Sequence, residues 1–184
     1  MSARCTVQLT IGGVHASAEP ALLKTLLGSC IAVCLWDEAA RVGGMNHFML
    51  PLGEAGGGDP GRFGVHAMDL LIGAIQRAGG QRGRLVAKLF GGGAVLASVL
   101  TAGRVPERNI EFIDRFMRLE GIPVQARDVG GTQARQVQFL TDTGQAFVKR
   151  LGAVQQRQQA RIERKLMKPR PTAQPAYGEI ELWT

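Results

Sequence analysis

Two short apolar segments separated by a polar loop occur in residues 25–51, which read TLLGSCIAVCLWDEAARVGGMNHFMLP. The apolar segments span residues 31–36 and 42–50, and their length is typical of strands. The residues between them, 37–41, are polar enough to form a hairpin loop. This part of the chain therefore predicts two adjacent antiparallel strands.

A loop centred on residues 39–40 fixes how these strands would pair. Ala32 then lies opposite His47, and Cys30 lies opposite Met49. In that register Cys30 and His47 are diagonal neighbours on one face of the sheet, with about 7–8 Å between their backbones. A register shift of one residue would put them on opposite faces. The favourable register allows His47 to accept the thiol proton of Cys30, which would make the sulfur a nucleophile.

Neighbouring residues could complete such a site. The hydroxyl of Thr25 is a candidate for orienting the imidazole of His47. The small residues before the cysteine expose backbone N–H groups that could hold a tetrahedral oxyanion. The candidates for binding the substrate or the oxyanion are Gly28, Ser29 and Asn46. The whole arrangement would suit attack on an acyl or amide carbonyl.

Each of these residues also has a structural interpretation. A cysteine beside an apolar strand is commonly a small core residue, which is how we interpret Cys34, and His47 could be a hydrogen-bonded core histidine. Cys30, Cys34 and His47 are too few and too widely spaced for zinc, so we predict no metal site. The glycines at 91–93 lack the pattern of a phosphate-binding loop and indicate a tight strand exit or close backbone approach to a substrate.

The remaining pattern predicts a layered α/β or α+β domain with more strands than helices. A helix is predicted around Met68 to Ile75, closed by glycines at 79–80, and a second around Ile110 to Met117, closed by Gly121. Residues 53–64 are predicted to be a loop, and residues 177–183 a terminal segment. The predicted strands are residues 6–11, 31–36, 42–50, 85–90, 122–127, 136–140 and 145–148.

Composition and charge exclude several classes of protein. The 184-residue chain has a net charge of +7, but residues 1–148 carry only +2, and residues 149–170 carry +7. The basic charge thus belongs to a tail, interpreted as a solvated helix, which argues against a nucleic-acid-binding domain. Three cysteines, no signal peptide and no long apolar run predict a cytoplasmic protein without membrane insertion or a disulfide framework.

Several motifs together resemble the CheD family of bacterial chemoreceptor glutamine deamidases. The resemblance predicts a CheD-like deamidase domain at residues 1–150 and a basic extension containing Gln and Pro at residues 151–184. The matching segments are TLLGSCIAVCLWD (25–37), GGMNHFMLP (43–51), RFGVHAMDLLI (62–72), AKLFGGGA (87–94), RNIEF (108–112), EGIPV (120–124), DVGG (128–131) and IELW (180–183).

The resemblance implies a fold, a reaction and partners. The fold would be a three-layer α/β/β sandwich with mixed sheets, similar to the catalytic domain of the cytotoxic necrotizing factor toxins. The reaction would be that of a protein-glutamine glutaminase, which converts glutamines on chemoreceptor cytoplasmic helices to glutamate and releases ammonia, without a cofactor or metal. The family's catalytic residues correspond to Cys30, His47 and Thr25.

Alternative functions remain open at this stage. One is a non-catalytic chemotaxis adaptor that binds a CheC-type phosphatase, a role known for some members of the family. Another is an amidohydrolase or thiol protease with small substrates, although no protease signature surrounds Cys30.

Overall fold

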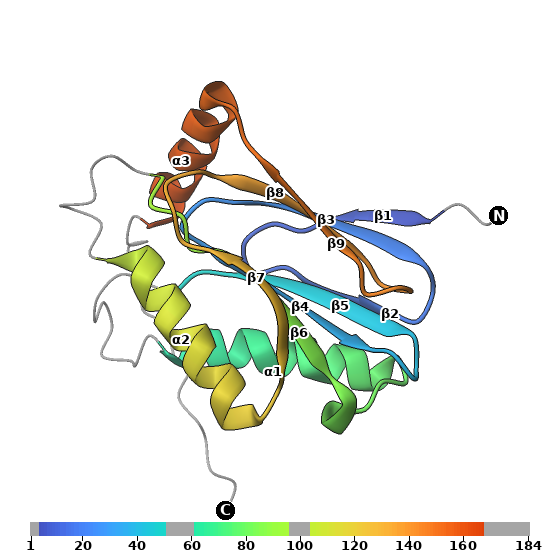
Figure 1. The fold of residues 1–184 in the computed structure, drawn as a ribbon. Coiled ribbons are helices and arrows are strands. Elements are labelled where there is room, and N and C mark those ends of the chain that lie inside the picture. Colours follow the sequence, from blue (N-terminus) through green and yellow to red (C-terminus); the bar gives the residue numbers. More distant parts are fainter. Residues whose placement is uncertain (1–3, 51–60, 96–103, 168–184) are drawn as a thin grey trace, which may run out of the picture.

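The computed structural model describes residues 4–50, 61–95 and 104–167, which form two β-sheets flanked by helices (Figure 1). The four-stranded sheet has the strand order β1 (Cys5–Gln8), β3 (Ala21–Leu27), β8 (Arg135–Leu140), β9 (Ala146–Arg150). The five-stranded sheet has the order β2 (Val14–Ser17), β5 (Val42–Phe48), β4 (Ile31–Asp37), β6 (Val86–Gly91), β7 (Val124–Val129). The helices are α1 (Gly61–Arg77), α2 (Val105–Glu120) and α3 (Ala153–Met167), with a short 3-10 helix, η1 (Arg82–Arg84).

The hairpin predicted from residues 25–51 lies at the centre of the five-stranded sheet. β4 pairs antiparallel with β5, and Ala32 lies opposite His47. This is the register expected from a loop at residues 39–40, and it puts Cys30, just before β4, on the same face as His47. β6 pairs with the other edge of β4, so the strand that follows Cys30 is held on both sides.

Alternate side chains of β4 enter two different cores. Ile31 and Val33 pack against side chains of α1 and α2. Ala32 and Cys34 pack in a second cluster with side chains of β3 and β8. The five-stranded sheet is therefore the middle layer, with α1 and α2 on one face and the four-stranded sheet on the other (Figure 1).

This arrangement confirms the predicted three-layer α/β/β sandwich. β1 runs parallel to β3 and β6 parallel to β7, while the other neighbours are antiparallel, so both sheets are mixed, as predicted. The likeness to the cytotoxic necrotizing factor domain stays a prediction.

Seven of the nine strands in the described part of the chain lie where the sequence predicts them, with ends that differ by at most three residues. The sequence does not predict β2 or β3. In β3 the outward positions include Leu22 and Leu26, so inward and outward residues are both apolar and the alternation is hidden. β2 has only four residues, each half-buried, which is too short for a clear pattern.

The two predicted helices are present as α1 and α2. α1 begins at Gly61, so residues 61–64 are helical where a loop is predicted. Gly64 lies directly against the ring of Phe112 on α2, so a close helix–helix contact accounts for a glycine in this turn despite its low helix propensity. α2 is followed by Gly121, as predicted. The rest of the predicted loop, residues 53–60, and the terminal segment 177–183 lie outside the described residues. None of the described helices is long and apolar enough to cross a membrane.

The third helix, α3, falls in the tail that the sequence interprets as solvated. It follows β9 and lies against Gly28 and Ser29, in the segment that joins β3 to β4 (Figure 1). Gln159 and Glu163 are buried there, so the expectation of a solvated helix is wrong for this face.

Candidate functional site

The candidate nucleophile lies in the 28–30 segment (Gly28, Ser29, Cys30), between β3 and β4. Cys30 is fully buried and packs in the cluster between the two sheets. His47, on β5, is also buried and projects into the same layer, since its neighbour across the ladder is Ala32. The structure thus brings Cys30 and His47 to one face of the middle sheet, as diagonal neighbours.

A hydroxyl fixes the orientation of the histidine. Thr25 Oγ1 lies 2.8 Å from His47 Nδ1 and donates its single proton to the carbonyl of Leu9 at 3.0 Å. Because that proton is already used, Oγ1 must accept a hydrogen bond from Nδ1–H. The lone pair of the imidazole is then on Nε2, which is buried and has no hydrogen-bond partner among the described residues.

The protonation states of this pair follow from burial. Burial lowers the pKa of His47 to about 4, so the imidazole is neutral near pH 7. Burial raises the pKa of the Cys30 thiol well above its ordinary value, and Glu163 raises it further through its charge and as a hydrogen-bond acceptor. The pair in this conformation is therefore a neutral thiol beside a neutral base.

Every carbonyl of the 28–30 segment is held by a donor from another part of the fold. Gly93 N–H donates to the carbonyl of Gly28 at 2.7 Å, and Gly92 N–H donates to that of Cys30 at 2.7 Å. Asn109 Nδ2 donates to the carbonyl of Ser29 at 2.8 Å. A carbonyl and the N–H group of the next residue lie in one trans peptide plane and point in opposite directions, so the bond from Gly93 also fixes the direction of the Ser29 N–H group. The N–H groups of Ser29 and, one peptide earlier, of Gly28 remain available for another acceptor.

A carboxylate from α3 binds to those N–H groups. Glu163 accepts hydrogen bonds from Gly28 N–H at 2.8 Å, from Ser29 N–H at 2.9 Å and from the Ser29 hydroxyl at 2.7 Å. Gln159 adds a fourth donor at 3.2 Å. Three of these donors come from the candidate oxyanion residues, so the 28–30 segment presents hydrogen-bond donors that can bind a carboxylate or carbonyl oxygen beside Cys30.

The structure does not bring Asn46 to this site. Its Oδ1 accepts from Val33 N–H at 3.1 Å, and its Nδ2 donates to the carbonyl of Ala67 on α1 at 3.0 Å. Asn46 therefore faces the helical layer, across the sheet from Cys30, and its expected role at the oxyanion is wrong. Adjacent strand residues point to opposite faces, so His47 and Asn46 cannot share a site on one face.

Three features of the site escape the sequence interpretation. Asn109 occupies a core position of α2, four residues before Ile113, and a polar residue in an apolar stripe is a signal that could have found it. The glycines at 91–93 are predicted to form a tight strand exit or to approach a substrate; they lie at the end of β6, and Gly92 and Gly93 donate to the carbonyls of Cys30 and Gly28, a contact that the sequence does not predict. Glu163, distant in sequence and on a polar helix, has no local signal.

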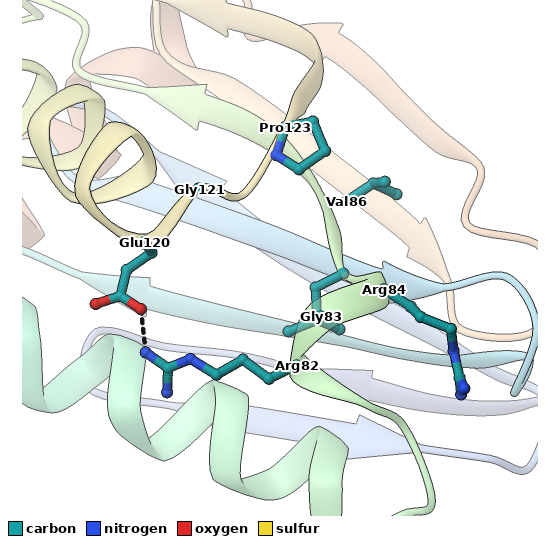
Figure 2. Close-up of a pocket in the computed structure, with 8 residues that line it drawn as sticks. Arg82, Gly83, Arg84, Val86, Glu120, Gly121 and Pro123 are labelled. Atoms are coloured by element: carbon teal, nitrogen blue, oxygen red, sulfur yellow. Dashed lines mark hydrogen bonds and ion pairs between the residues drawn. The ribbon is translucent and has the colours of Figure 1, made fainter.

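The rest of the described surface offers weaker candidates. A pocket of about 470 Å³ lies between η1 and the end of α2, where Arg82 and Glu120 form an ion pair (Figure 2). Glu120 is about 16 Å along α2 from Asn109, and neither cysteine nor histidine lines the pocket. Among the described residues, no group of three or more His, Cys, Asp or Glu side chains could hold a metal ion.

Comparisons with known proteins give one consistent family. The family model for CheD chemotactic sensory transduction matches residues 49–150. A probable chemoreceptor glutamine deamidase CheD from Paraburkholderia xenovorans is 43% identical over 167 residues, covering 88% of this chain and 66% of the relative. Proteins with the same name from Cupriavidus metallidurans and Stenotrophomonas maltophilia are 39% and 42% identical. These matches cover 98% and 88% of this chain, and 86% and 80% of the relatives.

Proposed function

Because the chain belongs to the CheD family of chemotactic sensory transduction proteins, we propose that it is a chemoreceptor glutamine deamidase. The reaction is that of a protein-glutamine glutaminase, in which a glutamine side chain of the receptor becomes glutamate and ammonia leaves. The names of the relatives support the reaction. The family-model match begins two residues after His47, so the roles of Cys30, His47 and Thr25 rest on their geometry.

One observation carries the mechanism. The Thr25 hydroxyl, 2.8 Å from Nδ1, fixes the tautomer of His47 that leaves the lone pair on Nε2, in the layer that contains Cys30. A structural histidine would satisfy both ring nitrogens, because a buried nitrogen without a partner costs free energy. Nε2 has no partner among the described residues, which supports a role for it as the general base.

In the first half of the reaction, Nε2 of His47 takes the proton of the Cys30 thiol as the sulfur attacks the carboxamide carbon. The carbonyl oxygen becomes an oxyanion, and the N–H groups of Gly28 and Ser29 stabilise it. When the carbon–nitrogen bond breaks, the imidazolium returns its proton to the nitrogen. Ammonia leaves, and a thioester links the glutamyl group to Cys30.

In the second half, water replaces ammonia. His47 Nε2 takes a proton from water as its oxygen attacks the thioester carbon. The carbon–sulfur bond breaks, the sulfur recovers its proton, and the glutamate product is released. One amide and one water thus become one carboxylate and one ammonium ion, with Cys30 and His47 restored, and no step calls for a cofactor.

The substrate we propose is a helix of the chemoreceptor cytoplasmic region, which places the reaction in the cytoplasm. Glutamine occurs throughout protein surfaces, so the side chain alone does not select the target. The surface around the 28–30 segment must also recognise the helix that carries the glutamine.

Mass spectrometry of a receptor cytoplasmic fragment tests this proposal. The fragment is incubated with the protein or with its Cys30→Ala variant, and peptides are sequenced to locate glutamine-to-glutamate conversions. We expect conversion at defined glutamines with the native protein and none with the variant. Equal conversion by both proteins would exclude Cys30 as the nucleophile. No conversion by either would favour the adaptor function, for which binding to a CheC-type phosphatase is the direct measurement.

A further inference from the structure

The face that α3 turns toward the body of the protein is polar. Over residues 153–165, where the structure describes its side chains, the buried and half-buried positions follow helical spacing and are Gln156, Gln159, Ala160 and Glu163. The larger apolar residues within this range, Val154 and Ile162, point outward and are 79% and 46% exposed. An amphipathic helix normally buries its apolar stripe against its partner. α3 instead binds through amide and carboxylate groups, so hydrogen bonding to the surface beneath it determines its position.

That surface, which we call the rim of the candidate site, consists of the backbone at Thr132, Leu26, Gly28 and Ser29. Gln156 donates to the carbonyl of Thr132 at 3.0 Å, and Gln159 donates to the carbonyl of Leu26 at 3.3 Å. One turn further along α3, the carboxylate of Glu163 lies across Gly28. A Cβ at position 28 would lie 2.6 Å from Glu163 Oε1, so glycine is needed for this close approach.

The chemistry of Glu163 matches that of a reaction product. Deamidation of a glutamine in a helix yields a glutamate in a helix. The glutamate side chain is as long as that of the glutamine and keeps the carbonyl oxygen of the original amide. Glu163 is such a residue, and its oxygens accept from the N–H groups of Gly28 and Ser29 beside Cys30. These are the donors that the proposed mechanism assigns to the carbonyl oxygen of the substrate.

We infer that α3 is an internal product mimic, in which Glu163 occupies the position of the target side chain and α3 occupies that of the receptor helix. This inference rests on the proposed function, and it identifies the substrate site as a surface that binds a helix. The receptor helix must displace α3 before Cys30 can react, so the structure is a self-inhibited form of the enzyme.

The state of Cys30 agrees with this inference. The thiol has no solvent exposure, and burial together with Glu163 keeps it protonated. Removing Glu163 from the site would remove a negative charge next to the sulfur and favour the thiolate. The hydrogen bonds of α3 to the rim can be replaced by bonds to water or to another helix, so opening does not require the domain to unfold.

A first experiment asks whether residue 163 sits where the reaction occurs. In the full-length Glu163→Gln variant, the side chain is a glutamine held in the proposed target position. We expect the enzyme to convert it to glutamate, at a rate that does not depend on protein concentration. In the Cys30→Ala, Glu163→Gln double variant, it should remain glutamine.

The same region carries its own control. Residues 150–165 also contain four native glutamines, at 155, 156, 158 and 159, which should stay unchanged while position 163 is converted. If the introduced glutamine persists in a preparation of Glu163→Gln that deamidates a receptor fragment, the inference is overturned and the proposed function stands. If neither position 163 nor the receptor is converted, the proposed function fails as well.

A second experiment measures the self-inhibition without any substrate. Iodoacetamide alkylation of Cys30 is followed by peptide sequencing, which separates it from Cys34. We expect Glu163→Ala to accelerate alkylation about tenfold or more, because each unit by which the thiol pKa falls raises the thiolate fraction about tenfold. Gln158→Ala, an exposed position on α3, is the matched control and should react like the native protein.

Kinetics with the receptor fragment complete the test. Glu163→Ala should lower KM and leave kcat nearly unchanged, because the fraction of open enzyme limits the apparent affinity. Equal alkylation of the native protein and Glu163→Ala, with both folded by circular dichroism, would overturn the inference. If Glu163→Ala is alkylated faster but neither the native protein nor any variant deamidates the receptor fragment, α3 does cover Cys30 and the proposed function is wrong.

Discussion

Asn109 Nδ2 donates to the carbonyl oxygen of Ser29 at 2.8 Å, and this one bond connects helix α2 to the segment that carries Cys30. The other end of the same amide accepts from Leu50 N–H at 2.9 Å, just beyond β5. One fully buried side chain thus joins the segment before β4 to the end of β5. The relative position of Cys30 and His47 depends on these two strands, so Asn109 is a positioning residue.

Asn109→Ala should weaken both stability and activity. The change leaves two buried backbone groups without partners, and each such group costs about 1–3 kcal/mol. The Ser29 carbonyl lies in the same peptide plane as the Cys30 N–H group, so the backbone that carries the nucleophile would also lose its fixed direction. We therefore expect kcat to fall by about 10²-fold, the loss that a misplacement of about 1 Å can cause. Urea unfolding and deamidation kinetics measure the two effects. Arg115→Ala, exposed on the same helix, should change neither; an unaltered kcat in Asn109→Ala would contradict the role.

Thr25→Val should lower kcat more than it alters the fold. Valine fills the same volume but leaves the carbonyl of Leu9 and Nδ1–H of His47 without the hydroxyl, and the imidazole can then rotate or change tautomer. We expect kcat to fall by about 10²-fold, the lower end of the contribution of general acid–base catalysis. Thr25→Ser keeps the hydroxyl and should retain most of the activity. Equal rates for the Ser and Val variants would show that the hydroxyl is dispensable.

The part of the site that could be predicted depends on local geometry. A short hairpin loop determines which residues face each other, so the pairing of Ala32 with His47 follows from the position of residues 39–40. The same rule of alternation excludes Asn46, because it is adjacent to His47 on one strand. The sequence thus contains the information needed to correct that assignment.

The part that could not be predicted depends on contacts distant in sequence. Glu163 reaches Gly28 across 135 residues, and neither hydrophobic periodicity nor charge pattern reports such a pairing. A basic, glutamine-rich helix looks solvated because its buried face is polar. β3 is hidden for a related reason, since Leu22 and Leu26 remove the contrast between its inner and outer positions.

Gly91→Ala should destabilise the fold through the backbone of the nucleophile. Gly91 has φ of 113°, and a Cβ there would lie 2.0 Å from the carbonyl oxygen of Cys30. Strained backbone of this kind costs about 1–3 kcal/mol, and each kcal/mol lowers Tm by about 2–4 °C in a protein of this size. Gly83→Ala is the matched control, because a Cβ there meets nothing within 4 Å. Calorimetry should show a lower Tm only for Gly91→Ala; equal Tm values would contradict the close approach.

The buried histidine should make the stability of the fold depend on pH. Burial lowers the pKa of His47 from 6.5 to about 4, so the unfolded chain binds one more proton than the folded chain between these two values. Stability therefore falls as the pH drops through this window, and His47 contributes no pH dependence above it. The shift corresponds to about 3 kcal/mol between pH 7 and pH 4.

His47→Asn isolates this effect from that of the carboxylates. Asparagine can still hydrogen-bond to the Thr25 hydroxyl, but it does not titrate, so the variant lacks the proton uptake of the imidazole. We expect the free energy of unfolding in urea to fall by about 3 kcal/mol more in the native protein than in the variant between pH 7 and pH 4. Parallel pH profiles for the two proteins would mean that His47 accepts a proton in the folded state at its ordinary pKa. In that case it could not be the neutral, buried base on which the proposed mechanism depends.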